Sequence, residues 1–404
     1  MKLIDTPLTV GRKTLQNRIV FQPMEGCDGT REGAPDELTC RRYLRFAEGG
    51  AGLIWFEATA VVPEGRANPR QMYLHEGTLG SFRALLGEVR RKSAETCGFS
   101  PVIVAQLTHS GRFSKPEGTP APLVAYRNPL WELGKEDQPY VVVSDEYCAS
   151  LPEKFARAAR LAEEAGFDGV DVKCCHGYLM NEFLSARERP GNYGGSLENR
   201  TRLYFDCIDA VKSAVGGRLL VTTRLNGCDG FPYPYGFGVN ENNEIDLTET
   251  KIILNELQKR GIKLVDLTIG NPYLIPHVNR PWRFGPEDGR VSMQRIYEVT
   301  RELKAAAPEL KLVMSGLTYP GVTALDEAND ALEAGVADLA GFGRMTFAYP
   351  TFYREWRDTG ALSPKKVCLA CGKCSQLMRA GTVAGCPVRD SSVYSAYYKK
   401  YVNR

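Results

Sequence analysis

Short runs of apolar, β-branched residues recur along the chain, and segments with helical spacing separate most of them. The runs predict strands at residues 19–24, 52–57, 102–107, 169–173, 219–225, 264–269, 311–315 and 338–342. The segments between them predict helices, among others at residues 152–165, 198–215, 248–260, 292–307 and 324–334. This alternation predicts an α/β protein and favours a (β/α)8 TIM barrel over a doubly wound sheet.

The two ends of the chain add features that a plain barrel lacks. Residues 8–15 alternate around Gly11 and predict a small hairpin before the first barrel strand. After Pro364 the sequence becomes rich in cysteine and then in Tyr and Lys. We therefore divide the chain into a barrel over residues 1–360 and a cysteine-bearing segment over residues 361–404. The connections at residues 111–148 and 227–244 are long and rich in Gly and Pro, which is typical of functional loops.

Composition excludes several classes of protein. The chain has 404 residues, of which 43% are hydrophobic and 25% charged, and this is typical of a globular protein with a large core. Its 51 Lys and Arg residues nearly balance 48 Asp and Glu residues, so no basic field recruits nucleic acid or an anionic membrane. No apolar run reaches the length of a membrane span, and the first residues do not resemble a secretory signal. The sequence therefore predicts a cytoplasmic protein.

Four of the twelve cysteines are crowded near the C-terminus. Cys368, Cys371 and Cys374 fall within seven positions. Cys386 comes later in the chain and directly precedes a proline. A compact group of three cysteines with one more distant cysteine is typical of an iron–sulfur cluster. Zinc also accepts four cysteines, although usually as two separated pairs, and unligated thiols are the remaining alternative. The spacing favours the cluster.

Further candidate residues follow the predicted strands, where a barrel places its active site. His109 comes directly after the third strand, and His176 comes after the fourth. Gly316 and the pair Gly343-Arg344 follow the last two strands, where backbone amides and an arginine can hold a phosphate. No G-x-G-x-x-G motif follows a strand, so the sequence contains no visible Rossmann domain.

Several of these motifs together resemble a known family. Residues 15–24, 106–112, 176–179 and 193–200, the last reading Tyr-Gly-Gly-Ser-Leu-Glu-Asn-Arg, resemble the Old Yellow Enzyme family of FMN-dependent ene-reductases. The pair Gly343-Arg344 fits the same family. The cysteine segment resembles its iron–sulfur branch, which includes 2,4-dienoyl-CoA reductase and trimethylamine dehydrogenase. The resemblance covers essentially the whole chain, with the motifs in the family's order.

The resemblance implies a set of cofactor and catalytic residues. FMN would be held by Pro23, Met24, Ala58, Gln106, Arg224, Gly316, Gly343 and Arg344. Tyr178 matches the family's proton donor, and His176 with Lys173 would bind the activating oxygen of the substrate. Lys173 stands where the family usually has His, and Glu25 stands where Thr or Cys often contacts the flavin O4. A carboxylate at that position has to be protonated or turned away. Tyr273, His277 and Arg280, in the loop after the sixth strand, are candidates for substrate contact.

These residues predict an enzyme that contains FMN and a [4Fe–4S] cluster and reduces an activated C=C bond of a small molecule. Two alternatives are an oxidative dehydrogenase or demethylase of the trimethylamine dehydrogenase type, and an electron-transfer subunit of a complex. This sequence ends at Arg404 without a dinucleotide motif, so we expect electrons from a separate donor protein that docks near residues 368–386. Direct hydride transfer from NAD(P)H is the alternative route, and a homo-oligomer remains open.

Overall fold

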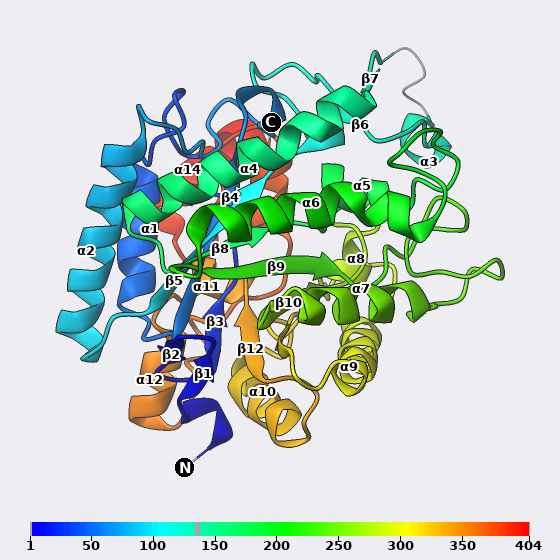
Figure 1. The fold of residues 1–404 in the computed structure, drawn as a ribbon. Coiled ribbons are helices and arrows are strands. Elements are labelled where there is room, and N and C mark those ends of the chain that lie inside the picture. Colours follow the sequence, from blue (N-terminus) through cyan, green and yellow to red (C-terminus); the bar gives the residue numbers. More distant parts are fainter. Residues whose placement is uncertain (1, 134–137, 404) are drawn as a thin grey trace.

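Eight parallel strands close into a barrel in the computed structural model, which describes residues 2–133 and 138–403 (Figure 1). Their bounds are β3 (Ile19–Phe21), β4 (Leu53–Ala60), β5 (Val102–Thr108), β8 (Gly169–Val172), β9 (Leu220–Asn226), β10 (Leu264–Thr268), β11 (Lys311–Met314) and β12 (Leu339–Phe342). They follow one another around the ring in chain order, and β12 closes it on β3. The predicted TIM barrel and all its strands are confirmed.

The strands are almost entirely buried because helices cover their outer side and side chains fill the barrel. The helices are α1 (Glu37–Ala47), α2 (Leu79–Cys97), α4 (Asp145–Ala165), α5 (Leu179–Leu184), α6 (Leu197–Val215), α7 (Thr248–Lys259), α8 (Pro276–Asn279), α9 (Gly289–Ala306), α10 (Ala324–Glu333), α11 (Arg344–Ala348) and α12 (Phe352–Thr359). Every residue of β4, β5 and β10 is buried. Continuous apolar strands of this kind are expected where a parallel sheet is covered on both faces.

The predicted N-terminal hairpin is also confirmed, as β1 (Leu8–Val10) paired with β2 (Lys13–Leu15). It lies at the lower end of the barrel in Figure 1, beside α12 and far from the C-terminus. Val10 and Leu15 pack with Val20, Leu53 and other residues from the starts of the barrel strands. The hairpin therefore closes the amino-terminal end of the barrel and leaves the carboxyl end for the site.

Helix α4 begins seven residues earlier than the sequence pattern predicts, at Asp145 instead of Pro152. Ser144 caps it by accepting a hydrogen bond from the Tyr147 amide at 3.2 Å. Cys148 and Leu151 of the added turns are buried against the barrel. The sequence pattern places the start of the helix at Pro152 because proline is common in the first turn of a helix. In the structure Pro152 lies inside the helix, because tertiary packing extends α4 toward the N-terminus.

The long connection before α4 carries structure of its own. It contains β6 (Leu123–Val124), α3 (Pro129–Glu132) and β7 (Val141–Val142), while residues 134–137 of the predicted loop lie outside the described residues. The strands β6 and β7 form a small parallel pair. This connecting segment lies above the carboxyl end of the barrel in Figure 1.

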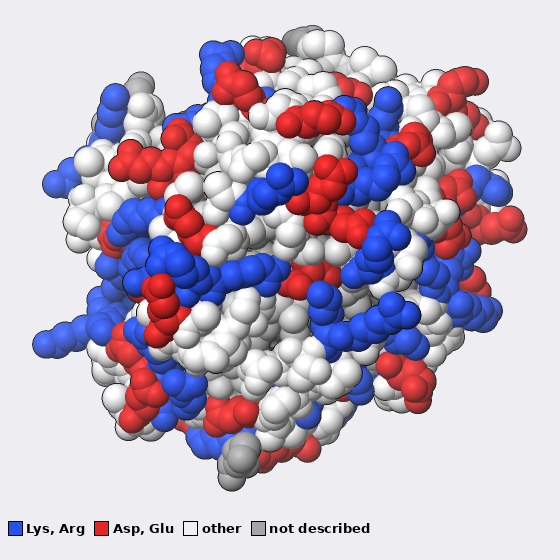
Figure 2. Space-filling model, turned by 60° about the vertical axis from the view of Figure 1, so that its left-hand side comes forward, with Lys and Arg blue, Asp and Glu red and all other residues white. Residues whose placement is uncertain are grey.

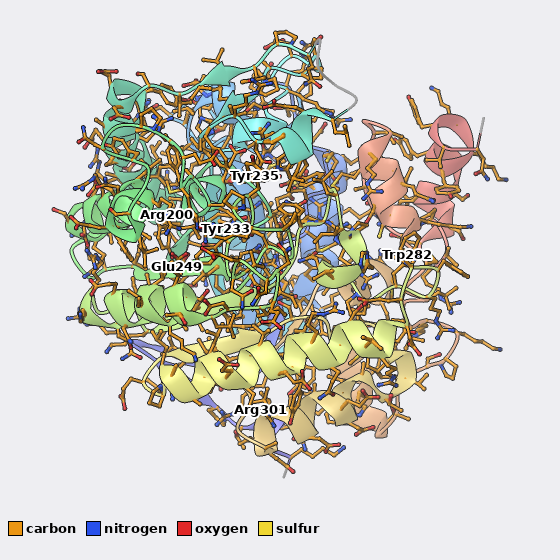
Figure 3. All side chains as sticks on the ribbon, turned by 90° about the vertical axis from the view of Figure 1, so that its right-hand side faces the viewer. Arg200, Tyr233, Tyr235, Glu249, Trp282 and Arg301 are labelled. Carbon is orange, nitrogen blue, oxygen red and sulfur yellow. The ribbon has the colours of Figure 1, made fainter. Side chains whose placement is uncertain are left out.

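The most specific sequence motif, at residues 193–200, joins helices around the barrel. Ser196 caps α6 by accepting from the Asn199 amide at 3.3 Å. The Arg200 guanidinium forms an ion pair with Glu249 of α7 and donates at 2.9 Å to the Gly195 carbonyl (Figure 3). The motif therefore fixes the positions of α6 and α7, and its contribution to the site is indirect.

The cysteine-bearing segment folds into α13 (Lys373–Arg379) and α14 (Ser391–Tyr401), which pack together through Leu377, Tyr394 and Tyr398. Arg41 and Arg45 of α1 both form ion pairs with the buried Asp390, which precedes α14. These contacts hold the segment against the barrel, near the carboxyl ends of the strands.

The surface mixes both signs of charge. On the face shown in Figure 2, lysine and arginine side chains alternate with acidic ones. No helix in the described part of the chain is both long and apolar enough to cross a membrane.

Candidate active site

A cavity opens at the carboxyl end of the barrel. Residues at or directly after the ends of most barrel strands line it, which is where barrel enzymes carry their active sites. The lining residues include Gln22, Pro23, Met24, Glu25, Gln106, Lys173, His176, Tyr178, Arg224, Thr268, Tyr273, Asn279, Arg280, Ser315, Gly316, Gly343, Arg344, Cys374 and Met378. We call this space the inner cavity.

The structure places all but one of the predicted cofactor residues on the wall of the inner cavity. These residues are Pro23, Met24, Gln106, Arg224, Gly316, Gly343 and Arg344. Ala58 does not line the cavity. It is buried in β4, where it is the register partner of Gln106 in β5. Residues in β5 and β9, and residues that follow β3, β11 and β12, therefore meet around one space, as binding of a single flat cofactor requires.

Two buried aspartates hold the polar groups of this wall in place. Asp171 accepts a hydrogen bond from the Gln106 side-chain amide at 2.7 Å and one from the Arg224 backbone amide at 2.7 Å. Burial raises the pKa of Asp171 to about 7. Asp266 forms an ion pair with the Arg224 guanidinium at 3.0 Å and accepts from Gln22 at 2.7 Å. Sequence reasoning missed both aspartates, although an acidic residue inside a buried apolar strand is a signal.

Glycines keep another part of the wall open. A side chain at Gly343 would place its Cβ 2.9 Å from the Met24 sulfur, and one at Gly316 would place it 2.7 Å from an Ile296 methyl group. Gly316 also has a φ of +86°, which favours glycine. Arg344 follows Gly343 and donates to the Pro281 carbonyl at 2.8 Å. The three residues provide a close backbone approach with a cation beside it, which suits a phosphate group.

Tyr178, Glu25, Lys173 and Tyr273 form a polar cluster on one side of the inner cavity. The Tyr178 hydroxyl donates to Glu25 Oε1 at 2.9 Å and lies 3.1 Å from the Tyr273 hydroxyl oxygen. Lys173 Nζ is 3.9 Å from Glu25 Oε1 and 3.5 Å from the centre of the Tyr178 ring. Burial, with Glu25 next to it, raises the pKa of Tyr178 well above its usual value. The hydroxyl therefore keeps its proton at neutral pH.

The cluster explains the two departures from the family pattern. Glu25 is not turned away from the cavity, because it faces Lys173 and accepts the Tyr178 hydrogen bond. The carboxylate at one unusual position is balanced by the ammonium group at the other. Burial lowers the pKa of Lys173 from its usual value, and the charge of Glu25 acts against this shift.

His176 presents a free nitrogen to the cavity. Its Nε2 is buried and has no hydrogen-bond partner among the described residues. Burial, together with the positive charges of Arg224 and Lys173, lowers the pKa of His176 well below its usual value. The residue has a φ of +66°, an uncommon backbone conformation outside glycine. A neutral imidazole held in this way can form a hydrogen bond to a bound ligand.

Of the predicted substrate residues, Tyr273 and Arg280 line the inner cavity, whereas His277 does not. Arg280 donates to the Ser375 hydroxyl at 2.7 Å, and burial with the nearby charge of Arg344 lowers its pKa to about 10. Arg280 therefore connects the inner cavity to the cysteine segment. His109 does not line the cavity either. Its Nε2 lies 2.8 Å from the Tyr147 hydroxyl of α4, which indicates a structural role.

The four cysteines of the C-terminal segment are unpaired, and Cys368, Cys374 and Cys386 pack against the core of the barrel. Cys368 is buried, and Cys371, Cys374 and Cys386 are half-buried. Backbone amides donate to two of the sulfurs, from Ala370 to Cys368 at 3.4 Å and from Arg389 to Cys386 at 3.3 Å. Within residues 2–133 and 138–403, no group of three or more His, Cys, Asp or Glu side chains is arranged to hold a metal ion.

The barrel and the composition of its inner cavity define the class of TIM-barrel flavoproteins. The chain belongs to the NADH:flavin oxidoreductase / NADH oxidase family, whose model matches residues 4–359. It is a flavin-dependent oxidoreductase, and the family supports FMN as the flavin. The predicted family is confirmed.

Individual relatives agree with this assignment. The chain is 31% identical over 353 residues to an NADPH dehydrogenase of Bacillus pumilus, covering 86% of this chain and 92% of that protein. Its fold is similar to that of 2-naphthoyl-CoA reductase, with a TM-score of 0.79 and 20% identity, covering 98% of this chain and 58% of that one. The fold is also similar to that of histamine dehydrogenase from Rhizobium sp. 4-9, with a TM-score of 0.73 and 20% identity. This match covers 95% of this chain and 52% of that one. The chain thus spans little more than half of these two structures, which show the fold alone.

Proposed function

We propose that the protein is an ene-reductase that contains FMN and a [4Fe–4S] cluster and reduces an activated C=C bond of a small unsaturated molecule. The observation that carries this proposal is that Tyr178 lines the inner cavity together with His176, whose Nε2 has no hydrogen-bond partner among the described residues. Bound FMN in its reduced form supplies a hydride. The residues of this chain would bind the substrate and supply a proton.

Three side chains divide this work. His176 would donate a hydrogen bond to the activating oxygen of the substrate, and Lys173 would add positive charge near it. Both groups withdraw electrons from the C=C bond and favour hydride addition at its far carbon. Tyr178 would then give its hydroxyl proton to the carbon next to the activating group.

The cysteine segment supports the cluster. Four thiolates around a cubane lie farther apart than four ligands around one ion, because the cluster fills the centre. Amide donors to Cys368 and Cys386 stabilise sulfur that carries negative charge. Cys374 also lines the inner cavity, so a cluster held there would lie beside the flavin.

The function is tested by an anaerobic screen of the dithionite-reduced protein. Unsaturated ketones, acids and thioesters are mixed with it, and reoxidation of the flavin is followed by its absorbance. We expect at least one activated alkene to reoxidise the flavin with formation of the saturated product. The opposite result is that no alkene is reduced in the screen and that amines reduce the flavin of the oxidised protein. This result would favour an oxidative dehydrogenase.

Replacing Lys173 with Met should weaken the binding of substrates with an anionic or strongly polarised oxygen more than that of a simple enone. The substitution keeps most of the side-chain volume and removes the charge that faces the cavity and Glu25. We expect an increase in KM of about tenfold for an unsaturated acid, which corresponds to about 1.4 kcal/mol. Steady-state kinetics with a matched acid and ketone measures the difference. Equal effects on both substrates would contradict the role of Lys173.

The charge of the cysteine segment supports a protein electron donor. Between residues 363 and 404 the basic residues are 365, 366, 373, 379, 389, 399, 400 and 404, and only Asp390 is acidic. Apolar side chains are exposed near the cysteines, with Leu369 37% and Phe284 71% exposed. Trp282, which lies beside Gly372, marks the same region (Figure 3). We propose that an acidic electron-transfer protein docks here.

Electron delivery through this surface should depend on salt. Reduction of the FMN by an acidic ferredoxin should slow several-fold as ionic strength rises from about 0.01 to 0.15 M, because salt screens the attraction. Stopped-flow mixing under anaerobic conditions measures the rate of FMN reduction at each ionic strength, and dithionite serves as a control donor. Reduction by NADH at the full turnover rate, unaffected by loss of the cluster, would favour direct hydride transfer instead.

A further inference from the structure

Glu25 and Tyr273 stand between two cavities. Next to the inner cavity lies a larger space, which we call the outer cavity and which Arg31, Lys115, Trp131 and Tyr397 also line. Glu25 and Tyr273 line both spaces, whereas Tyr178 and Lys173 line only the inner one. The Tyr178 hydroxyl is within hydrogen-bond distance of both boundary residues.

This arrangement matters because the proton donor is isolated from solvent. Tyr178 is 1% exposed. Flavin and substrate bound in the inner cavity would cover the Tyr178 hydroxyl on that side, and each reduction consumes its proton. The proton must therefore return through a side chain that contacts both Tyr178 and the outer cavity.

We propose that Glu25 is the proton relay that reprotonates Tyr178 from the outer cavity. This inference rests on the proposed function. The Tyr178 O–H bond breaks as a C–H bond forms on the substrate, which leaves a phenolate. The Glu25 carboxylate takes a proton from water in the outer cavity, leaving hydroxide in the solvent, and passes that proton to the phenolate oxygen. Tyr178 is then neutral again and Glu25 is again a carboxylate, and no group is oxidised or reduced in these steps.

The surroundings of Glu25 support this role. Its side chain is 14% exposed, enough to reach water, whereas the Tyr178 ring is enclosed. Lys173 Nζ, 3.5 Å from the centre of the Tyr178 ring, stabilises the negative charge that appears on the phenolate between the two transfers. Tyr273 is the other possible route. Burial raises its pKa above the usual value, and a phenol exchanges protons with water more slowly near neutral pH than a carboxyl group does.

The test compares the variant Glu25→Gln with the control variant Tyr273→Phe. The two are matched because each alters one hydrogen-bond partner of the Tyr178 hydroxyl. The substrate is the alkene from the screen that reoxidises the wild-type flavin fastest, with dithionite as reductant. Glu25→Gln should lower turnover by about 10²-fold, in the range of general acid catalysis, whereas Tyr273→Phe should lower it only a few-fold. Reoxidation by ferricyanide, which protonates no carbon, should be affected far less than alkene reduction in the Glu25→Gln variant.

Chemical rescue separates a relay from a structural role. Formate added to Glu25→Ala should restore turnover in proportion to its concentration, because a small carboxylic acid can occupy the space of the missing group. The FMN content of each variant, measured by absorbance, checks that the site is intact. Absence of rescue, together with a Tyr273→Phe defect as large as that of Glu25→Gln, would overturn the proposal.

The outcomes also distinguish this inference from the proposed function. If Tyr178→Phe is slow while Glu25→Gln turns over at the wild-type rate, the relay is wrong and Tyr178 remains the proton donor. If Tyr178→Phe turns over at the wild-type rate, the proposed function itself fails.

Discussion

Tyr178→Phe should slow reduction of the substrate by about 10²–10⁴-fold while FMN remains bound, because the change removes one proton donor and very little volume. The ring packs against Phe113 and Tyr273, so the apolar contacts survive the substitution. Single-turnover reoxidation of the reduced flavin by the unsaturated substrate measures the effect directly.

A matched control is Tyr126→Phe, which removes another buried hydroxyl outside the inner cavity. The Tyr126 hydroxyl oxygen lies 3.0 Å from the Ser185 hydroxyl oxygen and takes no part in the proposed chemistry. We expect it to affect stability more than turnover. Equal losses of turnover in the two variants would show that the effect of Tyr178→Phe is structural.

Cys371→Ser should remove the cluster and leave the barrel folded. The anaerobically purified wild-type protein should contain about four irons and four sulfides per chain, because four thiolates with this spacing fit a cubane. The serine variant should lose most of both. Its barrel should keep its unfolding transition, because the barrel strands and their helices form a core that does not include Cys371.

Iron and acid-labile sulfide analysis, with circular dichroism for the fold, measures these outcomes. Cys97→Ser is a suitable control, since this half-buried cysteine lies at the end of α2, outside the cysteine segment. One zinc per chain without sulfide would contradict the cluster assignment, and an unchanged metal content in Cys371→Ser would exclude Cys371 as a ligand.

The fold could be predicted well because a barrel strand is a local feature. Buried parallel strands such as β5 and β10 read as apolar runs, and the residues that end them are Gly, Pro or polar. Helix α4 was harder, because its first two turns depend on contacts that the sequence does not reveal. Tyr147 in those turns donates to Glu64, which lies far away in the chain.

The site could be predicted only in part, for a different reason. The motifs identified most residues that line the inner cavity, but each position was considered separately. Lys173 and Glu25 are 148 positions apart in the chain, and each is an unfavourable replacement when considered alone. The structure places them 3.9 Å apart, where each balances the charge of the other. Asp171 and Asp266 were missed because their role is to orient other side chains.

The cysteine segment forms part of the wall of the inner cavity, through Cys374, Met378 and Ala384. A cofactor held by such a wall is retained only as long as that segment stays folded. Loss of the proposed cluster, through iron starvation or exposure to oxygen, would thereby also shorten the lifetime of the bound flavin. We expect protein made under iron starvation to lose its yellow colour during purification faster than protein from iron-replete cells.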